Sequence, residues 1–121
     1  MLFIDAEHKQ RFSQRYYGSK DRTNEYVAAV YLLTSDENLW LRTLACFFDD
    51  EIDFSMAILK DIKAPEYVLY SAAKDLFTES DKLAYSDLFD RRIVTEKTLE
   101  LLINAMRIKR FGFKWCAAAE G

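Results

Sequence analysis

The sequence has little of the residues that break regular structure or build covalent and metal sites. Among 121 residues there are three glycines, one proline, two cysteines and one histidine. So few glycines and prolines argue against a disordered or low-complexity chain, and against a β-sandwich with many tight turns. The cysteines, Cys46 and Cys116, are too few and too far apart for a disulfide framework or a zinc site. We therefore expect no metal site and no cofactor.

Long hydrophobic runs are also missing. No apolar stretch approaches the roughly 20 residues that a membrane-spanning helix needs. The N-terminus meets charge at Asp5, too early for the apolar stretch of a signal peptide. We therefore expect a cytoplasmic protein without membrane contact. The length suits one domain, which we place over residues 1–116, with residues 117–121 as a disordered tail without a role.

The pattern that is present is a helical hydrophobic period, broken at polar clusters that resemble helix caps. It predicts an all-α fold, a single compact bundle of about six to seven short helices. We expect these helices at about residues 6–17, 24–33, 37–48, 54–62, 65–77, 83–89 and 96–111. Residues favoured in strands occur in YVAAVYLLT and VLYSAA, which leaves a small sheet as the alternative.

Individual residues mark several of these boundaries. Asp5, Asp53 and Thr95 are placed as N-caps, because their side-chain oxygens can accept hydrogen bonds from free backbone amides. Pro65 stands where proline is best tolerated, in a first helical turn. Gly112 ends the last helix, as a glycine just past a helix end commonly does. In the helix expected at 37–48, one face is predicted to face the core, with Trp40, Leu41, Leu44 and Phe48.

Charge is distributed unevenly along the chain. Residues 36–90 contain 13 acidic and 5 basic side chains, a net charge of −8, whereas residues 91–116 contain 7 basic and 2 acidic ones, a net charge of +5. The whole chain has a net charge of −3. Either the last helix lies against the acidic segment, with its cations near the negative end of the helix dipole, or its basic end is free to meet a partner.

The stretch RIKRFGFKW, residues 107–115, combines four cations with three aromatic rings. Nucleic-acid binding would need several such cations to displace counterions, and rings on which bases could stack. The acidic pI of about 5.2 argues against a dedicated nucleic-acid binder. The candidate binding residues, for a protein or a nucleic acid, are Arg91, Arg92, Arg107, Lys109, Arg110, Phe113, Lys114 and Trp115.

Two other clusters contain residue types that could form chemical sites. Asp49, Asp50, Glu51 and Asp53 lie close together, but they lack the alternating ligands, the glycine and the closing glutamate of an EF-hand loop. We expect a solvated capping loop there, with a weak or partner-completed metal site as the alternative. His8 lies near Asp5 and Glu7 and could act as a base, but no nucleophile motif accompanies it. We predict a surface or capping histidine, no catalytic residues and no enzyme; a hydrolase that uses His8 is a third alternative.

Aromatic residues are abundant, with 18 Phe, Tyr and Trp side chains. Aromatic residues and arginine are typical of interface cores. This excess predicts that part of the aromatic surface meets another protein. The candidates for exposure are Tyr16, Tyr17, Tyr67, Tyr70, Tyr85, Phe113 and Trp115.

The first two-thirds of the chain resembles a family. The segments FIDAEHKQRF, EYVAAVYLLTSDENLWLR, the aromatic and acidic stretch at 47–54, and SAAKDLF resemble the domain family of unknown function numbered 6075, which is associated with mobile elements of Firmicutes. The resemblance covers about residues 1–80. It implies a bacterial accessory protein of a mobile element, a setting in which binding or inhibiting host machinery is common, and it implies no catalytic residues.

Together these observations predict a non-catalytic protein-interaction module. Its partner would be a host protein or a second copy of the chain, as in a homodimer. The alternative is a nucleic-acid-binding accessory protein that uses the basic C-terminal helix.

Overall fold

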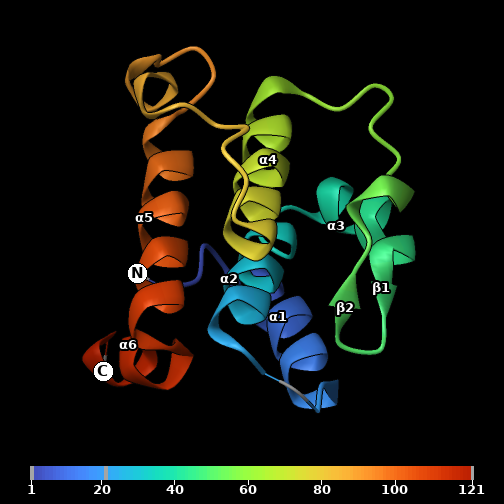
Figure 1. The fold of residues 1–121 in the computed structure, drawn as a ribbon. Helices are drawn as coiled ribbons and strands as arrows, with labels where there is room; N and C mark the ends of the chain where they lie inside the picture. Colours follow the sequence, from blue (N-terminus) through green and yellow to red (C-terminus); the bar gives the residue numbers. More distant parts are fainter. Residues whose placement is uncertain (1, 21, 121) are drawn as a thin grey trace.

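The fold is built around one buried helix. In a computed structural model, which describes residues 2–20 and 22–120, six α-helices surround a common core: α1 (Ala6–Gly18), α2 (Asn24–Leu33), α3 (Glu37–Thr43), α4 (Ala64–Thr78), α5 (Glu96–Phe111) and α6 (Phe113–Glu120) (Figure 1). The all-α prediction is therefore confirmed. Within the described part of the chain, a helix that could cross a bilayer is absent.

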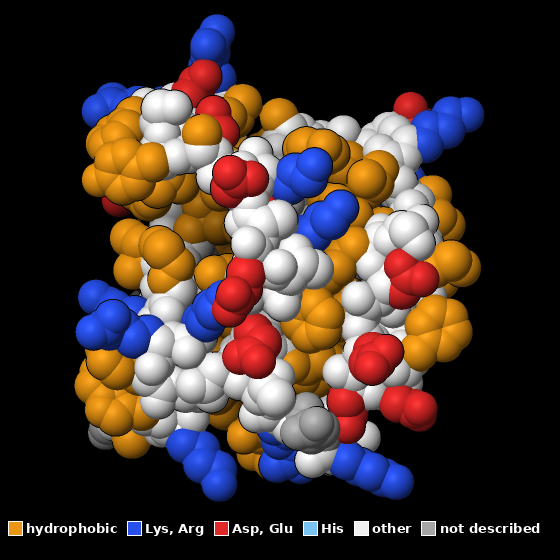
Figure 2. All heavy atoms as spheres, viewed as in Figure 1, with side chains coloured by type: hydrophobic (Ala, Val, Ile, Leu, Met, Phe, Trp, Pro, Cys, Tyr) orange, Lys and Arg blue, Asp and Glu red, His pale blue; other side chains and the backbone are white. Residues whose placement is uncertain are grey.

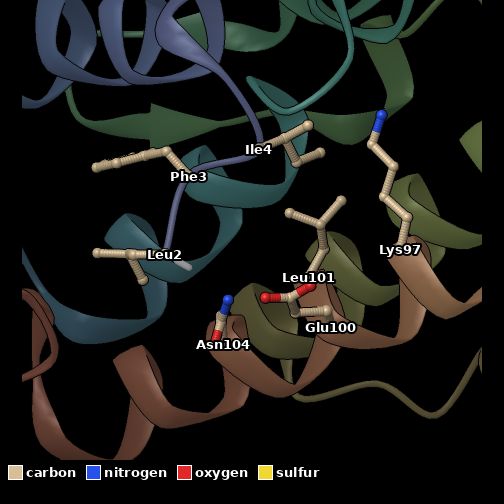
Figure 3. Close-up of a pocket in the computed structure, with 7 residues that line it drawn as sticks. All are labelled: Leu2, Phe3, Ile4, Lys97, Glu100, Leu101 and Asn104. Atoms are coloured by element: carbon tan, nitrogen blue, oxygen red, sulfur yellow. The ribbon is translucent and has the colours of Figure 1, made fainter. Parts of the chain in front are cut away.

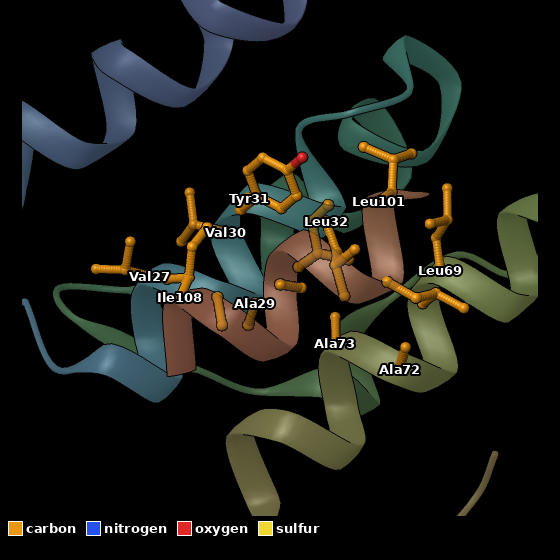
Figure 4. Close-up of a cluster of buried hydrophobic side chains, with 14 of the residues drawn as sticks. Val27, Ala29, Val30, Tyr31, Leu32, Leu69, Ala72, Ala73, Leu101 and Ile108 are labelled. Atoms are coloured by element: carbon orange, nitrogen blue, oxygen red, sulfur yellow. The ribbon is translucent and has the colours of Figure 1, made fainter. Parts of the chain in front are cut away.

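Helix α2 lies at the centre because its sequence is apolar on all sides. Every residue from 26 to 33 is buried, as expected for a helix without a polar face. Helices α4 and α5 pack against it from two sides, and Leu69 and Ala73 of α4 and Leu101 and Ile108 of α5 belong to the same buried cluster as Leu32 (Figure 4). The remaining helices, α1, α3 and α6, also contact α2.

Local capping explains why four of the helices begin where the sequence predicts. The Asp5 carboxylate accepts a hydrogen bond from the His8 amide at 2.7 Å, and the Thr95 hydroxyl accepts one from the Thr98 amide at 3.2 Å. Thr23 caps α2 in the same way, and Pro65 lies in the first turn of α4. Such caps satisfy amides that have no partner within the helix.

Residues 37–56 differ from the prediction. Helix α3 ends at Thr43, and it is followed by a short 3₁₀ turn at Leu44–Cys46 and an antiparallel hairpin of β1 (Phe47–Phe48) and β2 (Glu51–Ile52). Between residues 37 and 46 the buried residues are Leu39, Thr43 and Cys46. The expected core face was wrong: Leu41, Leu44 and Phe48 are exposed and Trp40 is half-buried.

The difference lies after the start of α3, which is at Glu37 as predicted. The sequence offers Ser35 or Asp36 as the cap there, and the Asp36 carboxylate accepts a hydrogen bond from the Leu39 amide at 2.9 Å. Residue Asp49 then adopts a left-handed conformation, with φ of 54°, in the hairpin turn. The backbone therefore leaves the helix before the stripe assumed from the sequence could form.

The segment after the hairpin is also less helical than predicted. Asp53 does cap a helix, but only the 3₁₀ turn η2 (Phe54–Met56) follows. The chain then lies along α3, where the Ile58 amide donates to the Arg42 carbonyl and the Arg42 guanidinium donates to the Lys60 carbonyl. The helical piece expected at 83–89 is the 3₁₀ turn η3 (Tyr85–Phe89).

The C-terminal residues form a helix in place of the expected tail. Helix α6 extends to Glu120, whose carboxylate accepts a hydrogen bond from the Leu2 amide at 2.7 Å. Cys116 of α6 is buried. This packing joins the two ends of the chain, and Gly121 lies outside the described residues.

Candidate functional site

The residues of RIKRFGFKW separate into two groups, because Gly112 turns the chain between α5 and α6. Gly112 has φ of 92° and ψ of 152°, a combination that is essentially restricted to glycine. Before the turn, Phe111 is 46% exposed. After it, Phe113 packs inward, with its ring centroid 4.8 Å from that of Phe12 and 5.0 Å from that of Tyr16.

The outward group forms one exposed surface. The Phe111 and Trp115 rings stack with centroids 4.5 Å apart and planes 28° from parallel. The Arg110 guanidinium lies 5.5 Å from the centroid of the Phe111 ring. On the other side, Trp115 shares the wall of a small cavity with Arg107. We call this the basic aromatic surface, made of Arg107, Arg110, Phe111, Lys114 and Trp115.

Figure 2 shows this arrangement at the lower left of the molecule, where Lys and Arg side chains lie beside hydrophobic ones over the lower end of α5 and α6. Acidic side chains gather instead at the lower right, over the hairpin. Among residues 2–20 and 22–120, neither Arg107, Arg110 nor Lys114 has an ion-pair partner. These charges are therefore directed to solvent.

A groove extends the basic aromatic surface toward the start of α2. The groove has a volume of about 260 Å³, and its lining includes Phe111, Lys114 and Trp115 together with Arg22. The Arg22 guanidinium lies 4.6 Å from the centroid of the Tyr16 ring, a cation–π contact. No carboxylate lines this groove among the described residues, so its potential favours an anionic group.

Three of the predicted binding cations lie elsewhere. Arg91 and Arg92 precede α5, at the end of that helix opposite to the basic aromatic surface (Figure 1). A helix of 16 residues separates its ends by about 24 Å. Arg92 is paired with Asp90 at 2.9 Å. Lys109 faces α4, where its ammonium donates to the Leu76 carbonyl at 2.8 Å and lies 3.8 Å from Glu79.

Lys109 thus satisfies a carbonyl at the C-terminal end of α4. The charge distribution left open whether the basic residues of the last helix serve packing or a partner, and for this one cation the structure confirms packing. Sequence reasoning named Phe111 as a ring for base stacking but omitted Arg22 from the candidate residues. Arg22 is far from residues 107–115 in the chain, and no local pattern indicates its position.

His8, the candidate base, was predicted to be a surface or a capping residue; it is buried, so the surface position is wrong. Its Nδ1 accepts a hydrogen bond from the Ile4 amide at 3.2 Å, so its Nε2–H donates to the Tyr31 carbonyl at 2.9 Å. Burial lowers the pKa of His8 to about 4. Both nitrogens are occupied by backbone groups, and the imidazole therefore acts as a structural link between α1 and α2.

A carboxyl pair at the starts of α3 and α4 also serves structure. Burial and the neighbouring Glu66 raise the pKa of Asp36, whose carboxyl caps α3. Burial opposes the ionisation of Glu66, but hydrogen bonds from the Lys63 amide and the Asn38 side chain outweigh it and lower the pKa of Glu66. Neither carboxyl lines the groove beside the basic aromatic surface or the cavity that Trp115 shares with Arg107.

The acidic hairpin cluster has structural partners as well. The Asp50 carboxylate accepts from the Lys20 amide at 3.1 Å, and Asp53 accepts from the Ser55 amide. Among the described residues, no three His, Cys, Asp or Glu side chains lie together in a way that could hold a metal ion. Both cysteines are buried as free thiols, and burial raises the pKa of Cys46 to about 11.

A cavity of about 310 Å³ lies between the N-terminal segment and α5. Figure 3 shows Glu100 and Asn104 of α5 opposite Leu2. The Asn104 amide donates to the Tyr31 hydroxyl at 3.1 Å, and this hydroxyl in turn donates to the Leu2 carbonyl. The polar groups here fasten the N-terminus to the core, so this cavity belongs to the packing of the chain.

Comparison with known proteins adds no family: the chain matches no protein-family model, no curated protein and no solved structure. The resemblance to family 6075 therefore stays a prediction from the sequence.

Proposed function

We propose that this chain is a non-catalytic protein-interaction module of the cytoplasm, and that it binds an acidic, aromatic-containing protein segment through the basic aromatic surface. The observation that carries the proposal is the exposed Phe111–Trp115 stack beside cations without described ion-pair partners. Exposed rings next to arginine are typical of the residues that dominate binding energy at interfaces. An accessory or inhibitory role in a mobile genetic element belongs to the same proposal and rests on the resemblance of residues 1–80 alone.

The number of clustered cations favours a protein partner over a nucleic acid. Of the six cations expected to contact phosphates, only Arg107, Arg110 and Lys114 belong to the basic aromatic surface, and Arg22 adds a fourth. The affinity of such a site for nucleic acid depends on how many phosphates are neutralised. Three or four contacts, on a chain with a net charge of −3, provide little of this electrostatic term.

A nucleic acid remains the second candidate because of one specific observation. The groove beside the surface is lined by the rings of Phe111 and Trp115 and by Arg22 and Lys114, without a described carboxylate. Proteins that bind single-stranded nucleic acids use aromatic rings on which bases stack, together with cations along a groove. A test of the protein partner therefore needs a nucleic-acid arm.

The test is a selection of random short peptides, displayed on phage, against the immobilised protein. We expect the selected peptides to be rich in Asp, Glu and aromatic residues. Measured by fluorescence anisotropy, their affinity should fall at least about tenfold when Arg110→Glu is combined with Trp115→Ala, since one charge and one central ring are lost.

The hairpin offers a matched control. Glu51→Lys with Phe48→Ala also reverses one charge and removes one exposed ring, since Phe48 is 57% exposed and Trp115 is 53% exposed. The control should retain peptide binding. Equal loss in both variants, or selected peptides without an acidic bias, would contradict the proposal.

The nucleic-acid arm uses a labelled single-stranded oligonucleotide at about 50 and 200 mM salt. Binding that decreases steeply with salt and disappears in the Arg110→Glu, Trp115→Ala variant would replace the protein partner with a nucleic acid. Absence of binding at the lower salt concentration would leave the protein partner as the conclusion.

A further inference from the structure

A second, apolar groove lies between α4 and α5. Both helices pack on α2, and residues 79–84 run back between them toward the start of α5 (Figure 1). The groove has a volume of about 540 Å³, larger than the three cavities described above. Its apolar lining comes from α4, the connecting segment and α5 and includes Leu76, Leu83, Leu88, Leu102 and Met106.

The connecting segment is held in place by specific contacts, so the groove is preformed. The Asp75 carboxylate accepts hydrogen bonds from the Ser80 hydroxyl at 2.7 Å and from the Lys82 and Leu83 amides at 2.8 Å each. The Lys109 ammonium of α5 donates a hydrogen bond to the Leu76 carbonyl near the end of α4. A ligand would therefore find the walls of the groove in place, which reduces the ordering cost of binding.

The apolar surface continues beyond the groove. Tyr85 lines it and is 79% exposed, and the Tyr85 ring lies 5.5 Å from that of Phe89, which is 71% exposed. Met106 is 46% exposed. In Figure 2 hydrophobic side chains cover the upper left of the molecule, over η3 and the upper part of α5. Exposed apolar side chains that adjoin a groove are typical of an interaction site.

The charge around the groove is mainly negative, which favours a partner with positive charges. Residues 75–90 contain five carboxylates and one lysine, Lys82. Asp75, Glu79 and Asp81 line the groove, and the one cation among its lining residues, Lys109, is already engaged with Leu76 and Glu79. A partner that inserts apolar side chains would place its polar face against these carboxylates.

We propose that the α4–α5 groove binds a basic amphipathic helix of a partner protein. Such a helix would insert its apolar stripe against Leu76, Leu102 and Met106, and its Lys or Arg side chains would meet Glu79 and Asp81. Helices commonly dock in this way, through anchors spaced three and four residues apart, and methionine adapts well to such anchors. This groove is independent of the basic aromatic surface, since it selects a partner of the opposite charge.

The test uses two labelled peptides of about 18 residues, or five helical turns, with the same leucine stripe and either lysine or glutamate on the polar face. Fluorescence anisotropy should show that the lysine peptide binds and that the glutamate peptide binds at least about tenfold more weakly. Met106→Lys should weaken binding of the lysine peptide about tenfold, because it places a charge among the apolar anchors.

Met56 provides the control, because it is 47% exposed and does not line the groove, and Met56→Lys should leave binding unchanged. Glu79→Lys combined with Asp81→Lys should reverse the preference toward the glutamate peptide. Equal binding of both peptides, or equal loss in the two methionine variants, would overturn the proposal. So would a dimer that Met106→Lys dissociates, measured by analytical ultracentrifugation, or an apolar dye that occupies the groove while neither peptide binds.

The Arg110→Glu, Trp115→Ala variant should bind the lysine peptide normally, which separates the α4–α5 groove from the basic aromatic surface.

Discussion

The molecule contains two aromatic clusters that differ in what surrounds them. The inner cluster joins the rings of Phe3, Phe12, Tyr16, Tyr31 and Phe113, with His8 among them. The outer cluster is the Phe111–Trp115 stack with its cations. Inside, Tyr31 and His8 direct their polar atoms to backbone groups; outside, the cations face solvent. The same residue types therefore stabilise the fold in one cluster and are available for binding in the other.

The largest difference between the clusters should appear when a phenylalanine is truncated in each. Phe12→Ala removes a ring that is 1% exposed and contacts four other aromatic residues. It should lower the free energy of unfolding by about 3–5 kcal/mol, measured by urea denaturation. Phe111→Ala is the matched control and should cost less than about 1 kcal/mol. Equal losses would mean that the two rings are equally buried.

The second prediction concerns the pH dependence of stability. The pKa of His8 is about 4 in the folded state and about 6.5 in the unfolded chain. At pH values between these two, His8 is protonated in the unfolded chain and neutral in the folded protein. The free energy of unfolding should therefore decrease as the pH falls from about 6.5 to 4. The full contribution is about 3 kcal/mol, at 1.36 kcal/mol per pKa unit.

His8→Gln isolates this contribution, since an amide can still donate to the Tyr31 carbonyl but does not titrate. We expect the variant to be less dependent on pH over the same window in urea denaturation. The difference between the two curves removes the contribution of Asp36 and other carboxyl groups. Parallel curves would show that His8 does not titrate on unfolding.

The third prediction concerns the turn that separates the clusters. Gly112→Ala should lower the free energy of unfolding by about 1–3 kcal/mol, because its backbone conformation is strained for any residue with a Cβ atom. The added Cβ would lie 3.4 Å from Asn24, an ordinary contact, so the cost comes from the backbone. A Cβ atom added at Gly18 would have no neighbouring atom within 4 Å. Gly18→Ala should therefore leave the midpoint of thermal unfolding unchanged or slightly raised.

Much of the fold could be predicted because its determinants are local. Asp5, Thr95 and Pro65 each define a helix end through contacts within one turn, and a sequence pattern records such contacts. The start of α3 was predicted, but its end was not, because after Thr43 the chain leaves the helix and forms the hairpin in which Phe47 pairs with Ile52. Helix α6 was missed as well; its contact between Glu120 and Leu2 joins residues that are 118 positions apart.

The candidate site was predicted in part for the same reason. The composition of residues 107–115 identified the cations and rings, but their grouping depends on the direction in which each side chain points. Lys109 and Arg110 are neighbours in the sequence, yet one caps α4 and the other contacts Phe111. Arg22 joins the groove through the path of the chain between α1 and α2, which no local pattern describes.

The smallest effect on stability should come from the residue with the largest effect on binding. Trp115→Ala should change the free energy of unfolding by less than about 1 kcal/mol, because the ring is 53% exposed. The same change should weaken binding of a selected acidic peptide about tenfold.

Phe113→Ala should show the reverse pattern. It should lower the free energy of unfolding by about 2 kcal/mol and leave peptide binding nearly unchanged at a temperature well below the unfolding transition. The two rings are two residues apart and differ mainly in the cluster they join. If both substitutions reduced stability equally, the Trp115 ring would belong to the core, and the basic aromatic surface would lose its central anchor.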